Sequence, residues 1–489
     1  MIRKTFTIIV VFLFLMGCSE DFLNNPPKGQ PTTGNFPTTA NDAELAINGV
    51  YNTLRIWNLH AGGFPILDIM SDEAKKGSNP GDGVVIKQFE EFTFTPSNGS
   101  FERWWGSLYK GIKRSHLVVE NVPGINMDEQ VQTRILAEAR FLRGFFYFTL
   151  VRAFGDVPKV TSSEPPQKMG RTDKEEIYQE IIIPDFEFAI EHLPVRSDYS
   201  SSELGRATKG AARGLLAKVY LWRENYELAE QYALDVINSE QYSLDPDFAN
   251  VFDEPFGPGA ILEVGALPRT SMENGGNQYA NTWGVRGEPN LGWGFGRPSW
   301  SLIQDMQADP RQDPTVAFLG ETIGGITILG DDNTPDTTYN DQNEIEQVEC
   351  YNQKTFVPST TTEGSYGYNR KFLRYADVLL VAAEALNEND KPEQALIYLN
   401  QVRERARENA GELPDVTTTD KAALREAIIH ERHMELALEG KRFWDLVRTG
   451  KATEILGPLG FVEGRHELMP IPQNEINMSE GAMSQNPKY

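Results

Sequence analysis

The sequence predicts a mainly α-helical protein, a scaffold of paired helices that carries one long, irregular and partly β-stranded insert. Three observations support this fold class. Apolar residues recur at helical spacing along most of the 489 residues, and two of the helical segments repeat each other. From about residue 251 to 358, in contrast, helical periodicity is lost and glycine is frequent.

Seven segments have the apolar spacing of amphipathic helices. In the first of them, Ala43, Ala46, Ile47 and Val50 mark one face. Pro184 interrupts the fourth, so we expect that helix to end or kink there. The segments are 42–54, 104–119, 130–154, 175–193, 208–239, 371–407 and 421–447.

The repeat lies in residues 213–233 and 376–400, each of which predicts two helices joined by a short polar turn. A shift of 166 residues places Ala217 on Ala383 and Ala229 on Ala395. Small residues at these points let paired helices approach closely, as in tetratricopeptide-like repeats. We therefore expect a tetratricopeptide-like scaffold, with two unrelated helical hairpins as the alternative.

The insert at about 251–358 contains ten glycines from Gly257 to Gly296. Runs of β-type residues at 260–264 and 323–329 predict short strands, and paired glycines predict turns. A smaller excursion of the same kind covers 71–99. Irregular segments of this length in a helical protein are usually functional, so we expect the ligand face here.

The amino-terminal segment has the layout of a secretory signal. Arg3 and Lys4 precede an apolar run that ends in Leu15-Met16-Gly17-Cys18. The run is about half of the roughly 20 residues that a membrane-spanning helix needs. It resembles a lipoprotein signal, which would be cleaved before Cys18 and leave that residue lipidated; an ordinary signal peptide is the alternative. We expect a signal at 1–17, a lipidated Cys18 with a Pro-rich tether at 18–37, and a single domain at 38–489.

Net charge and cysteine content argue against a nucleic-acid-binding protein and against a disulfide-bonded one. The formal net charge is −24, or −26 once Arg3 and Lys4 leave with the signal, because each carries one positive charge. Such an acidic surface repels nucleic acid, so we expect no nucleic-acid partner. It argues only weakly against polyanionic ligands, because a local basic pocket can exist on an acidic protein. With Cys18 lipidated, Cys350 has no partner in the chain, and we expect no disulfide.

Motifs for common catalytic and metal sites are missing from the sequence. There is no P-loop, no Gly-x-Ser-x-Gly and no His-Glu-x-x-His. His430 and His433 have a spacing that can bind metal, but no third ligand is evident. Residues 331–349 hold seven acidic residues and no basic one; a solvated loop is favoured over a structural calcium site. We therefore expect no cofactor and no metal centre at His430 and His433, with a structural calcium ion left open. Carboxylates are too numerous to exclude a glycosidase pair by counting, but no pair stands out, so the sequence gives no reason to assert an enzymatic activity.

Three tryptophans lie in irregular or glycine-rich stretches: Trp57, Trp283 and Trp293. A tryptophan flanked by glycine cannot pack deeply by itself, and its flat face suits the C–H face of a sugar ring. Packing of these side chains over the core from a loop is the alternative. Trp300 follows Arg297-Pro298, and we expect it to begin a helix.

Several motifs resemble those of one known family. The motifs are 71–73 (SDE), 137–143 (AEARFLR), 154–158 (FGDVP), 371–380 (KFLRYADVLL), 383–387 (AEALN), 399–406 (LNQVRERA), 431–436 (ERHMEL), 439–450 (EGKRFWDLVRTG), 469–476 (MPIPQNEI) and 485–487 (QNP). In these motifs and their order the chain is similar to the SusD/RagB family of outer-membrane nutrient-binding lipoproteins. One departure is Lys488, where the family usually has glycine.

This resemblance implies a tetratricopeptide-like scaffold whose irregular inserts form the ligand face. It also implies a lipoprotein on the outer surface of the outer membrane that binds oligosaccharides and delivers them to a SusC-like TonB-dependent transporter. Ser19-Glu20-Asp21 is similar to the acidic signal that exports such lipoproteins to the surface. The arginines of the signature motifs, Arg374, Arg432 and Arg442, are expected to form helix-to-helix ion pairs with Asp377, Glu435 and Asp445.

The ligand site is predicted from position and residue type. Tryptophans would stack on sugars, while carboxylate and amide groups would accept hydrogen bonds from hydroxyls. The predicted site residues are Trp57, Asp72, Tyr279, Asn281, Trp283 and Trp293.

Other functions stay open at this point. A peptide- or protein-binding lipoprotein of the same transporter-lid type, as in RagB, would need a groove with unpaired strand edges. A surface hydrolase would need two facing carboxylates about 5 to 10 Å apart. A pure scaffold for another protein would leave the long insert unexplained.

Overall fold

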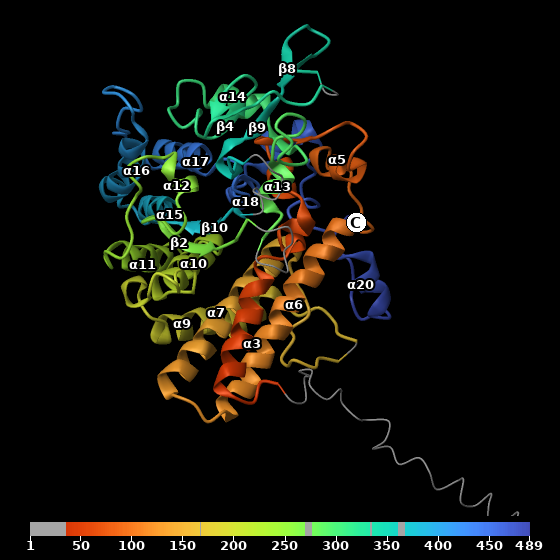
Figure 1. Ribbon diagram of the computed structural model, residues 1–489, viewed down its shortest axis with the longest axis vertical. Helices are drawn as coiled ribbons and strands as arrows, with labels where there is room; N and C mark the ends of the chain where they lie inside the picture. The colour runs from red at the N-terminus through yellow and green to blue at the C-terminus, as the bar shows by residue number, and fades with distance from the viewer. Residues whose placement is uncertain (1–35, 167, 269–275, 333–334, 360–366) are drawn as a thin grey trace, which may run out of the picture.

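A computed structural model of the chain describes residues 36–166, 168–268, 276–332, 335–359 and 367–489 (Figure 1). The predicted signal at 1–17, the lipidation site Cys18 and the tether up to residue 35 lie outside the described residues. No helix in the described ranges has both the length and the apolar character needed to cross a bilayer.

Three long helices form one end of the scaffold, side by side in Figure 1: α3 (Ala40–Thr53), α6 (Gly99–Asn121) and α7 (Glu129–Phe154). Side chains cap all three, because Thr39, Asn98 and Asp128 accept hydrogen bonds from backbone N–H groups of the first turns. The second helix begins earlier than its apolar spacing predicts, since Asn98 caps it at Gly99. The first and third predicted helices are confirmed within two residues.

Pro184 does not end its helix. The segment consists of α8 (Lys174–Ile177), a π-helical stretch (Tyr178–Ile182) and α9 (Ile183–His192). Proline at the second position of α9 follows the π-helical stretch, where the hydrogen-bond pattern has already shifted. The expected helix end at Pro184 is therefore wrong, and a change of helical type from π to α lies just before it.

The predicted repeat is two stacked helix pairs. All four alanines that the repeat aligns, Ala217, Ala229, Ala383 and Ala395, are fully buried. The second helix of the first pair packs on the first helix of the second pair, which continues the stack. The pairs are α10 (Lys209–Trp222) with α11 (Tyr226–Ile237), and α15 (Tyr375–Glu388) with α16 (Pro392–Ala406). The scaffold therefore follows the tetratricopeptide-like arrangement that the sequence predicts.

The beginning of the predicted helix at 371–407 is a strand. Strand β10 (Arg370–Arg374) pairs antiparallel with β2 (Ala260–Val264), with Arg370 opposite Val264 and Arg374 opposite Ala260. β2 confirms the predicted strand at 260–264, and its five residues are all buried. This pairing joins the insert to the scaffold, because β10 leads directly into α15.

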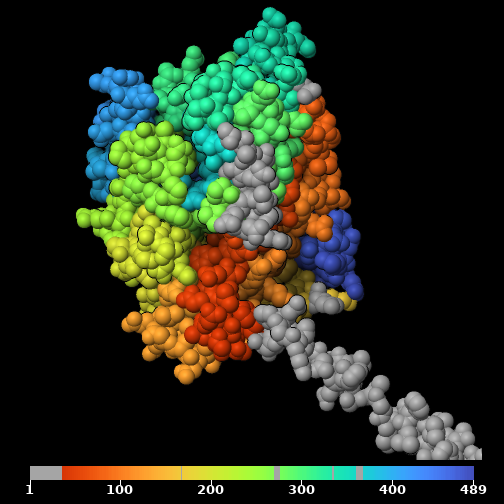
Figure 2. Space-filling model, in the orientation of Figure 1, coloured from red at the N-terminus to blue at the C-terminus, as the bar shows by residue number. Residues whose placement is uncertain are grey.

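The insert consists of short elements and two-stranded antiparallel pairs. In Figure 2 the green and cyan insert forms the top of the molecule, above the red, orange and yellow helices. The predicted strand at 323–329 is a small hairpin of β5 and β6. The remaining insert elements are α12 (Asn250–Asp253), α13 (Tyr279–Trp283), β3 (Phe295–Pro298), α14 (Trp300–Asp305), β4 (Val316–Phe318), β5 (Thr322–Ile323), β6 (Ile326–Thr327), β7 (Thr337–Tyr339), β8 (Ile345–Val348) and β9 (Cys350–Asn352).

The smaller excursion at 71–99 joins the insert through strand β1 (Ala74–Gly77). β1 pairs antiparallel with β3, and Lys75 lies opposite Arg297. The elements outside the insert are completed by α4 (Ile66–Ile69), α5 (Val84–Glu90), α17 (Lys421–Leu436), α18 (Arg442–Arg448), α19 (Ala452–Leu456) and α20 (Gln473–Met478).

Buried ion pairs connect the carboxyl-terminal helices to the scaffold. Arg432 contacts Asp377 at 3.0 Å and Asp445 at 2.9 Å, and Arg374 contacts Glu435 at 2.9 Å. These contacts match the architectural role that the resemblance implies for Arg374 and Arg432. The remaining arginine, Arg442, pairs instead with Asp72.

Candidate functional site

Trp57 and Trp293 meet at the junction of the insert with the scaffold. Their ring centroids are 5.5 Å apart and their planes lie at 86°, an edge-to-face contact. Phe64 packs edge to face on Trp57, with centroids 5.3 Å apart. Both tryptophans are partly exposed. We call these two residues the tryptophan pair.

Backbone geometry and one hydrogen bond hold Trp57 in place. Its indole Nε1 donates a hydrogen bond to Thr282 Oγ1 at 3.2 Å. Gly63 has a φ of +102°, and a Cβ there would lie 2.6 Å from the Trp57 ring. Only glycine therefore lets the loop fold back under this ring.

Trp293 is held by its backbone. Its N–H donates to the carbonyl oxygen of Asn281 at 2.9 Å, and the next residue, Gly294, donates to Gly284 at 2.9 Å. A Cβ at Gly292 would lie 2.3 Å from the same Asn281 oxygen. Glycine therefore allows the segment around Trp293 to approach α13 closely.

The structure corrects the expectation that flanking glycines keep Trp283 near the surface. Trp283 is only 1% exposed. Gly296 lies against its ring, where a Cβ would come within 2.6 Å, so a glycine from β3 creates the space that the indole fills. The ring therefore belongs to the core under the insert and presents no open face.

Tyr279 and Asn281 are buried with Trp283. The Tyr279 ring packs on His60 and Tyr368, with centroids 4.9 and 6.0 Å away. Asn281 donates from Nδ2 to the carbonyl oxygen of Leu291 at 3.2 Å, and its Oδ1 has no partner among the described residues. Both side chains support the loops that carry the tryptophan pair.

Asp72 lies in a different place, a hollow of about 530 Å³ between β1, α14 and α19. None of the other five predicted site residues lines this hollow. Trp300, Gln304 and Asp305 of α14 form one of its walls. We call it the α14 hollow.

Arg442 binds both carboxylate oxygens of Asp72, at 2.8 and 2.7 Å. Burial opposes ionisation of this carboxyl group, but the hydrogen bonds from Arg442 lower its pKa below the usual value. Asp72 is therefore an ionised, structurally engaged carboxylate at the edge of the hollow.

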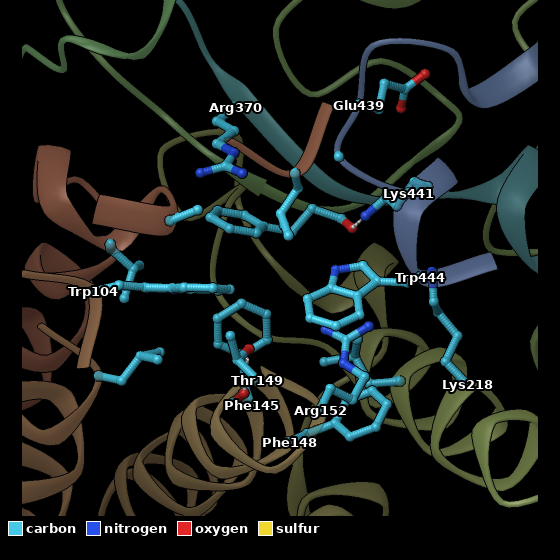
Figure 3. Close-up of a pocket in the computed structure, with 17 residues that line it drawn as sticks. Trp104, Phe145, Phe148, Thr149, Arg152, Lys218, Arg370, Glu439, Lys441 and Trp444 are labelled. Carbon is cyan, nitrogen blue, oxygen red and sulfur yellow. Dashed lines mark hydrogen bonds between the residues drawn. The ribbon is translucent and has the colours of Figure 1, made fainter. Parts of the chain in front are cut away.

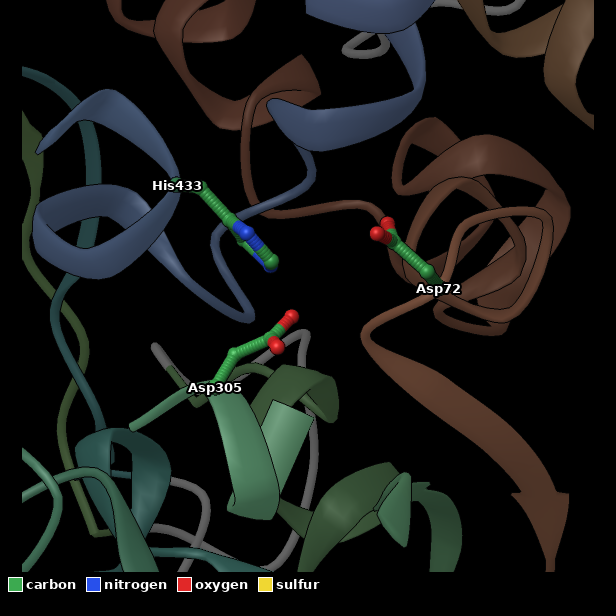
Figure 4. A group of neighbouring side chains, drawn as sticks. All are labelled: Asp72, Asp305 and His433. Atoms are coloured by element: carbon green, nitrogen blue, oxygen red, sulfur yellow. The ribbon is translucent and has the colours of Figure 1, made fainter. Parts of the chain in front are cut away.

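Asp72, Asp305 and His433 point toward one another in Figure 4 and offer ligand atoms within 4.8 Å of each other. Burial lowers the pKa of His433 to about 3, so its imidazole is neutral. Arg442 already compensates the charge of Asp72 and would repel a cation. A neutral imidazole can bind a metal, but the positive charge of Arg442 beside Asp72 disfavours a cation between these three side chains.

The acidic segment at 331–349 is held by ion pairs near its two ends. Asp331 pairs with Arg286 at 2.6 Å and Glu349 with Arg297 at 3.2 Å. Glu344, between them, is exposed. This arrangement favours the solvated loop over a calcium site.

Comparisons with known proteins agree with the motifs. The "SusD family" profile matches residues 258–464, and the profile "Starch-binding associating with outer membrane" matches 67–221. SusD-like protein P2 of Formosa agariphila is 30% identical, and the match covers 99% of both chains. The chain belongs to the SusD family. A SusD-like protein of Bacteroides ovatus is 27% identical, covering 91% of this chain and 82% of that protein.

Solved SusD structures share the fold. A laminarin-binding SusD-like protein superimposes with a TM-score of 0.76 at 27% identity, covering 92% of this chain and 100% of that one. A SusD homologue from Bacteroides thetaiotaomicron gives a TM-score of 0.79 at 25% identity, covering 94% and 98%. The arrangement of paired helices with a long insert is therefore that of the SusD family.

The sequence does not indicate that α14 lies beside Asp72. It predicts that Trp300 begins a helix, and this is confirmed, because Ser299 caps α14 by accepting from Leu302 N. The position of that helix depends on the β1–β3 pairing and on Ser299 N, which donates to the carbonyl oxygen of Glu73 at 2.8 Å. No local signal in the sequence indicates this long-range contact.

Proposed function

We propose that this SusD-family chain is a cell-surface lipoprotein that binds oligosaccharides and delivers them to a partner TonB-dependent transporter without catalysis. The observation that carries the proposal is the tryptophan pair: two partly exposed indoles on loops that glycines and backbone hydrogen bonds hold in place. A preformed aromatic surface binds sugar rings at low ordering cost.

Family membership supports a carbohydrate ligand. One matching family profile is described as starch-binding, and a structural relative at 27% identity is described as laminarin-binding. The planes of the Trp57 and Trp293 rings lie at 86° to each other, an arrangement that we propose suits a curved or twisted chain better than a flat one. We therefore assign sugar stacking to Trp57 and Trp293, and support of their loops to Tyr279, Asn281 and Trp283.

The α14 hollow is proposed as a second contact region. Its volume of about 530 Å³ falls in the range of small-ligand sites. Trp300 offers a partly exposed ring, and Gln304 and Asp305 offer exposed hydrogen-bonding groups beside it. Asp72 would mainly hold the Arg442 side chain in position there, because both of its carboxylate oxygens already accept hydrogen bonds from Arg442.

The absence of catalysis is part of the proposal. Asp72 and Asp305 come close together at the hollow, whose lining also holds Glu90, Glu346 and Glu454. Burial raises the pKa of Asp305, and Arg442 lowers that of Asp72. Because carboxylates with separated pKa values also occur in glycosidases, each oligosaccharide that binds should be incubated with the protein and analysed for cleavage. We expect none.

The anchor and the transporter follow from the family resemblance. We propose that Cys18 carries the lipid and that the body faces the outside of the outer membrane. Cys18→Ala should move the protein out of the membrane fraction. External protease should remove the lipidated protein from intact cells, and the transporter should co-purify with it. Protection from protease in intact cells would contradict surface exposure.

Binding can be tested by affinity gel electrophoresis of the chain starting at Ser19, on gels that contain plant, microbial or host glycans. Trp57→Ala and Trp293→Ala should each weaken retardation about tenfold, since a lost aromatic contact is worth on the order of 1–1.5 kcal/mol. Trp300→Ala tests the α14 hollow. Tyr339→Ala is a matched control, because Tyr339 is 56% exposed on β7.

Three outcomes separate the parts of the proposal. Loss of retardation in Trp57→Ala and Trp293→Ala with an intact fold supports the tryptophan pair. Loss only in Trp300→Ala moves the site to the α14 hollow. If no glycan retards the wild-type chain, carbohydrate binding by the isolated protein is wrong, and a peptide library tests the RagB-like alternative.

A further inference from the structure

A partly open cavity of about 90 Å³ lies between α6, α7, α10 and the start of α18 (Figure 3). Four basic side chains line it: Arg152, Lys218, Arg370 and Lys441. The carboxylate on its wall, Glu439, already pairs with Arg374 at 2.7 Å and Lys354 at 2.9 Å. We call it the basic cavity. Its positive excess contrasts with the net charge of −24 for the whole chain.

Arg152 of α7 has no counter-ion in contact with it. Within the described ranges no carboxylate lies within 4 Å of its guanidinium, and its Nε has no hydrogen-bond partner. Its partners are aromatic faces: Phe148 at 4.2 Å and Trp444 at 5.4 Å from the ring centroids. Figure 3 shows the guanidinium beside the Trp444 indole. Burial lowers the pKa of Arg152 to about 10, which reflects the missing partner.

Lys441 is the second cation with incomplete compensation. Its Nζ donates to the carbonyl oxygen of Phe372 at 2.9 Å, and no carboxylate of the described chain lies within ion-pair distance. Burial, followed by repulsion from Lys218, lowers its pKa to about 7. Lys218 itself pairs with Asp377, but Asp377 is shared with Arg432.

Arg370 adds a third under-compensated group. Its Nη1 is buried without a hydrogen-bond partner among the described residues, and its guanidinium stacks on Tyr279 at 4.2 Å and Phe372 at 4.6 Å. Aromatic faces attract a cation but accept none of the directed hydrogen bonds that a guanidinium offers. Buried charges are costly unless they are both paired and hydrogen-bonded. The basic cavity therefore provides two buried donors, Arg152 Nε and Arg370 Nη1, that have no acceptor among the described residues.

The size of the cavity suits a small anion. A water molecule occupies about 30 Å³, so 90 Å³ corresponds to about three waters or one small oxyanion. We propose that the basic cavity binds one inorganic oxyanion, sulfate or phosphate, between Arg152, Lys218 and Lys441. Oxyanions accept several charge-assisted hydrogen bonds at once, which matches these donors. This site is independent of the proposed glycan-binding function.

Isothermal titration calorimetry of the chain starting at Ser19 tests the proposal, with sodium sulfate and sodium phosphate titrated separately at constant ionic strength in a cacodylate-free organic buffer. We expect saturable binding with one site per chain for at least one of the two anions. Arg152→Gln should weaken it at least tenfold. Lys113→Gln is a matched control, since Lys113 is a half-exposed cation on α6 outside the cavity.

Lys441→Gln gives a second route if Arg152→Gln does not fold, and it should also weaken binding at least tenfold. A saturating concentration of the anion should raise the melting temperature of the wild-type chain more than that of each cavity variant, because the variants keep only the nonspecific stabilisation that sulfate and phosphate give to any folded protein. The proposal is overturned if neither anion binds the wild-type chain saturably. It is equally overturned if the folded cavity variants bind as tightly as the Lys113→Gln control.

Discussion

Arg442 and Asp72 form a bidentate ion pair across 370 positions of sequence, with N–O distances of 2.8 and 2.7 Å. The pair connects the start of α18 to the segment before β1, and each side chain is about one-tenth exposed. A residue predicted to accept sugar hydroxyls therefore also holds the carboxyl-terminal motif to the segment before β1.

Asp72→Asn should lower the free energy of unfolding by about 3–5 kcal/mol, because it leaves Arg442 buried without its charge partner. Urea unfolding followed by circular dichroism measures the change. The Asp72 contribution is present above the unfolded pKa of about 3.9 and is lost as the pH falls through the lower folded value. An unchanged urea midpoint at pH 7 would show that the Arg442–Asp72 ion pair does not stabilise the fold. Lys87→Gln removes an exposed ion pair with Glu91 and serves as the control.

Trp283→Ala should destabilise the protein by about 3–5 kcal/mol, the cost of removing a large buried aromatic side chain. Trp57→Ala should cost less, since Trp57 is partly exposed. Gly296→Ala should also destabilise, because φ is +68° there and the new methyl group would meet the Trp283 ring. Guanidinium unfolding of the three variants measures the order of their free energies of unfolding. A Trp283→Ala variant that is as stable as wild type but binds no glycan would return Trp283 to the ligand site.

Asp68→Asn should change the pH dependence of stability. Asp68 accepts from Gly440 N at 2.6 Å, and burial raises the pKa of its carboxyl group to about 7. The stabilising contribution of protonated Asp68 is complete below the unfolded pKa of about 3.9 and is lost as the pH rises through about 7. The wild-type chain should therefore lose on the order of 1 kcal/mol per pH unit between pH 5 and 7 relative to Asp68→Asn. Parallel pH profiles of the two melting temperatures would refute this assignment.

Cys350 should not react with a thiol reagent in the native protein. It is fully buried on β9, and burial raises the pKa of its thiol well above the usual range. In the chain starting at Ser19 it is the one remaining cysteine. Labelling in increasing urea should therefore follow global unfolding and end at one thiol per chain. Fast labelling without denaturant would show that the insert opens locally.

The helical scaffold was predictable because its signals are local. Capping residues such as Asn98 and Asp128 lie next to the helices they begin, and the aligned alanines Ala217 and Ala383 repeat at a spacing visible in the sequence. The strand at 370–374 was missed because its partner, β2, lies more than one hundred residues away and supplies the hydrogen bonds that decide between strand and helix.

The sequence by itself determined the class of protein: family motifs in order, a tetratricopeptide-like repeat and an irregular insert that carries tryptophans. Tertiary structure alone decided which tryptophans are accessible. Trp283 is buried because Gly296 leaves room for its ring, whereas Trp57 and Trp293 contact each other and stay partly exposed. The physical reason is that burial depends on which distant backbone segments approach one another, and residue type and local spacing do not encode that distance.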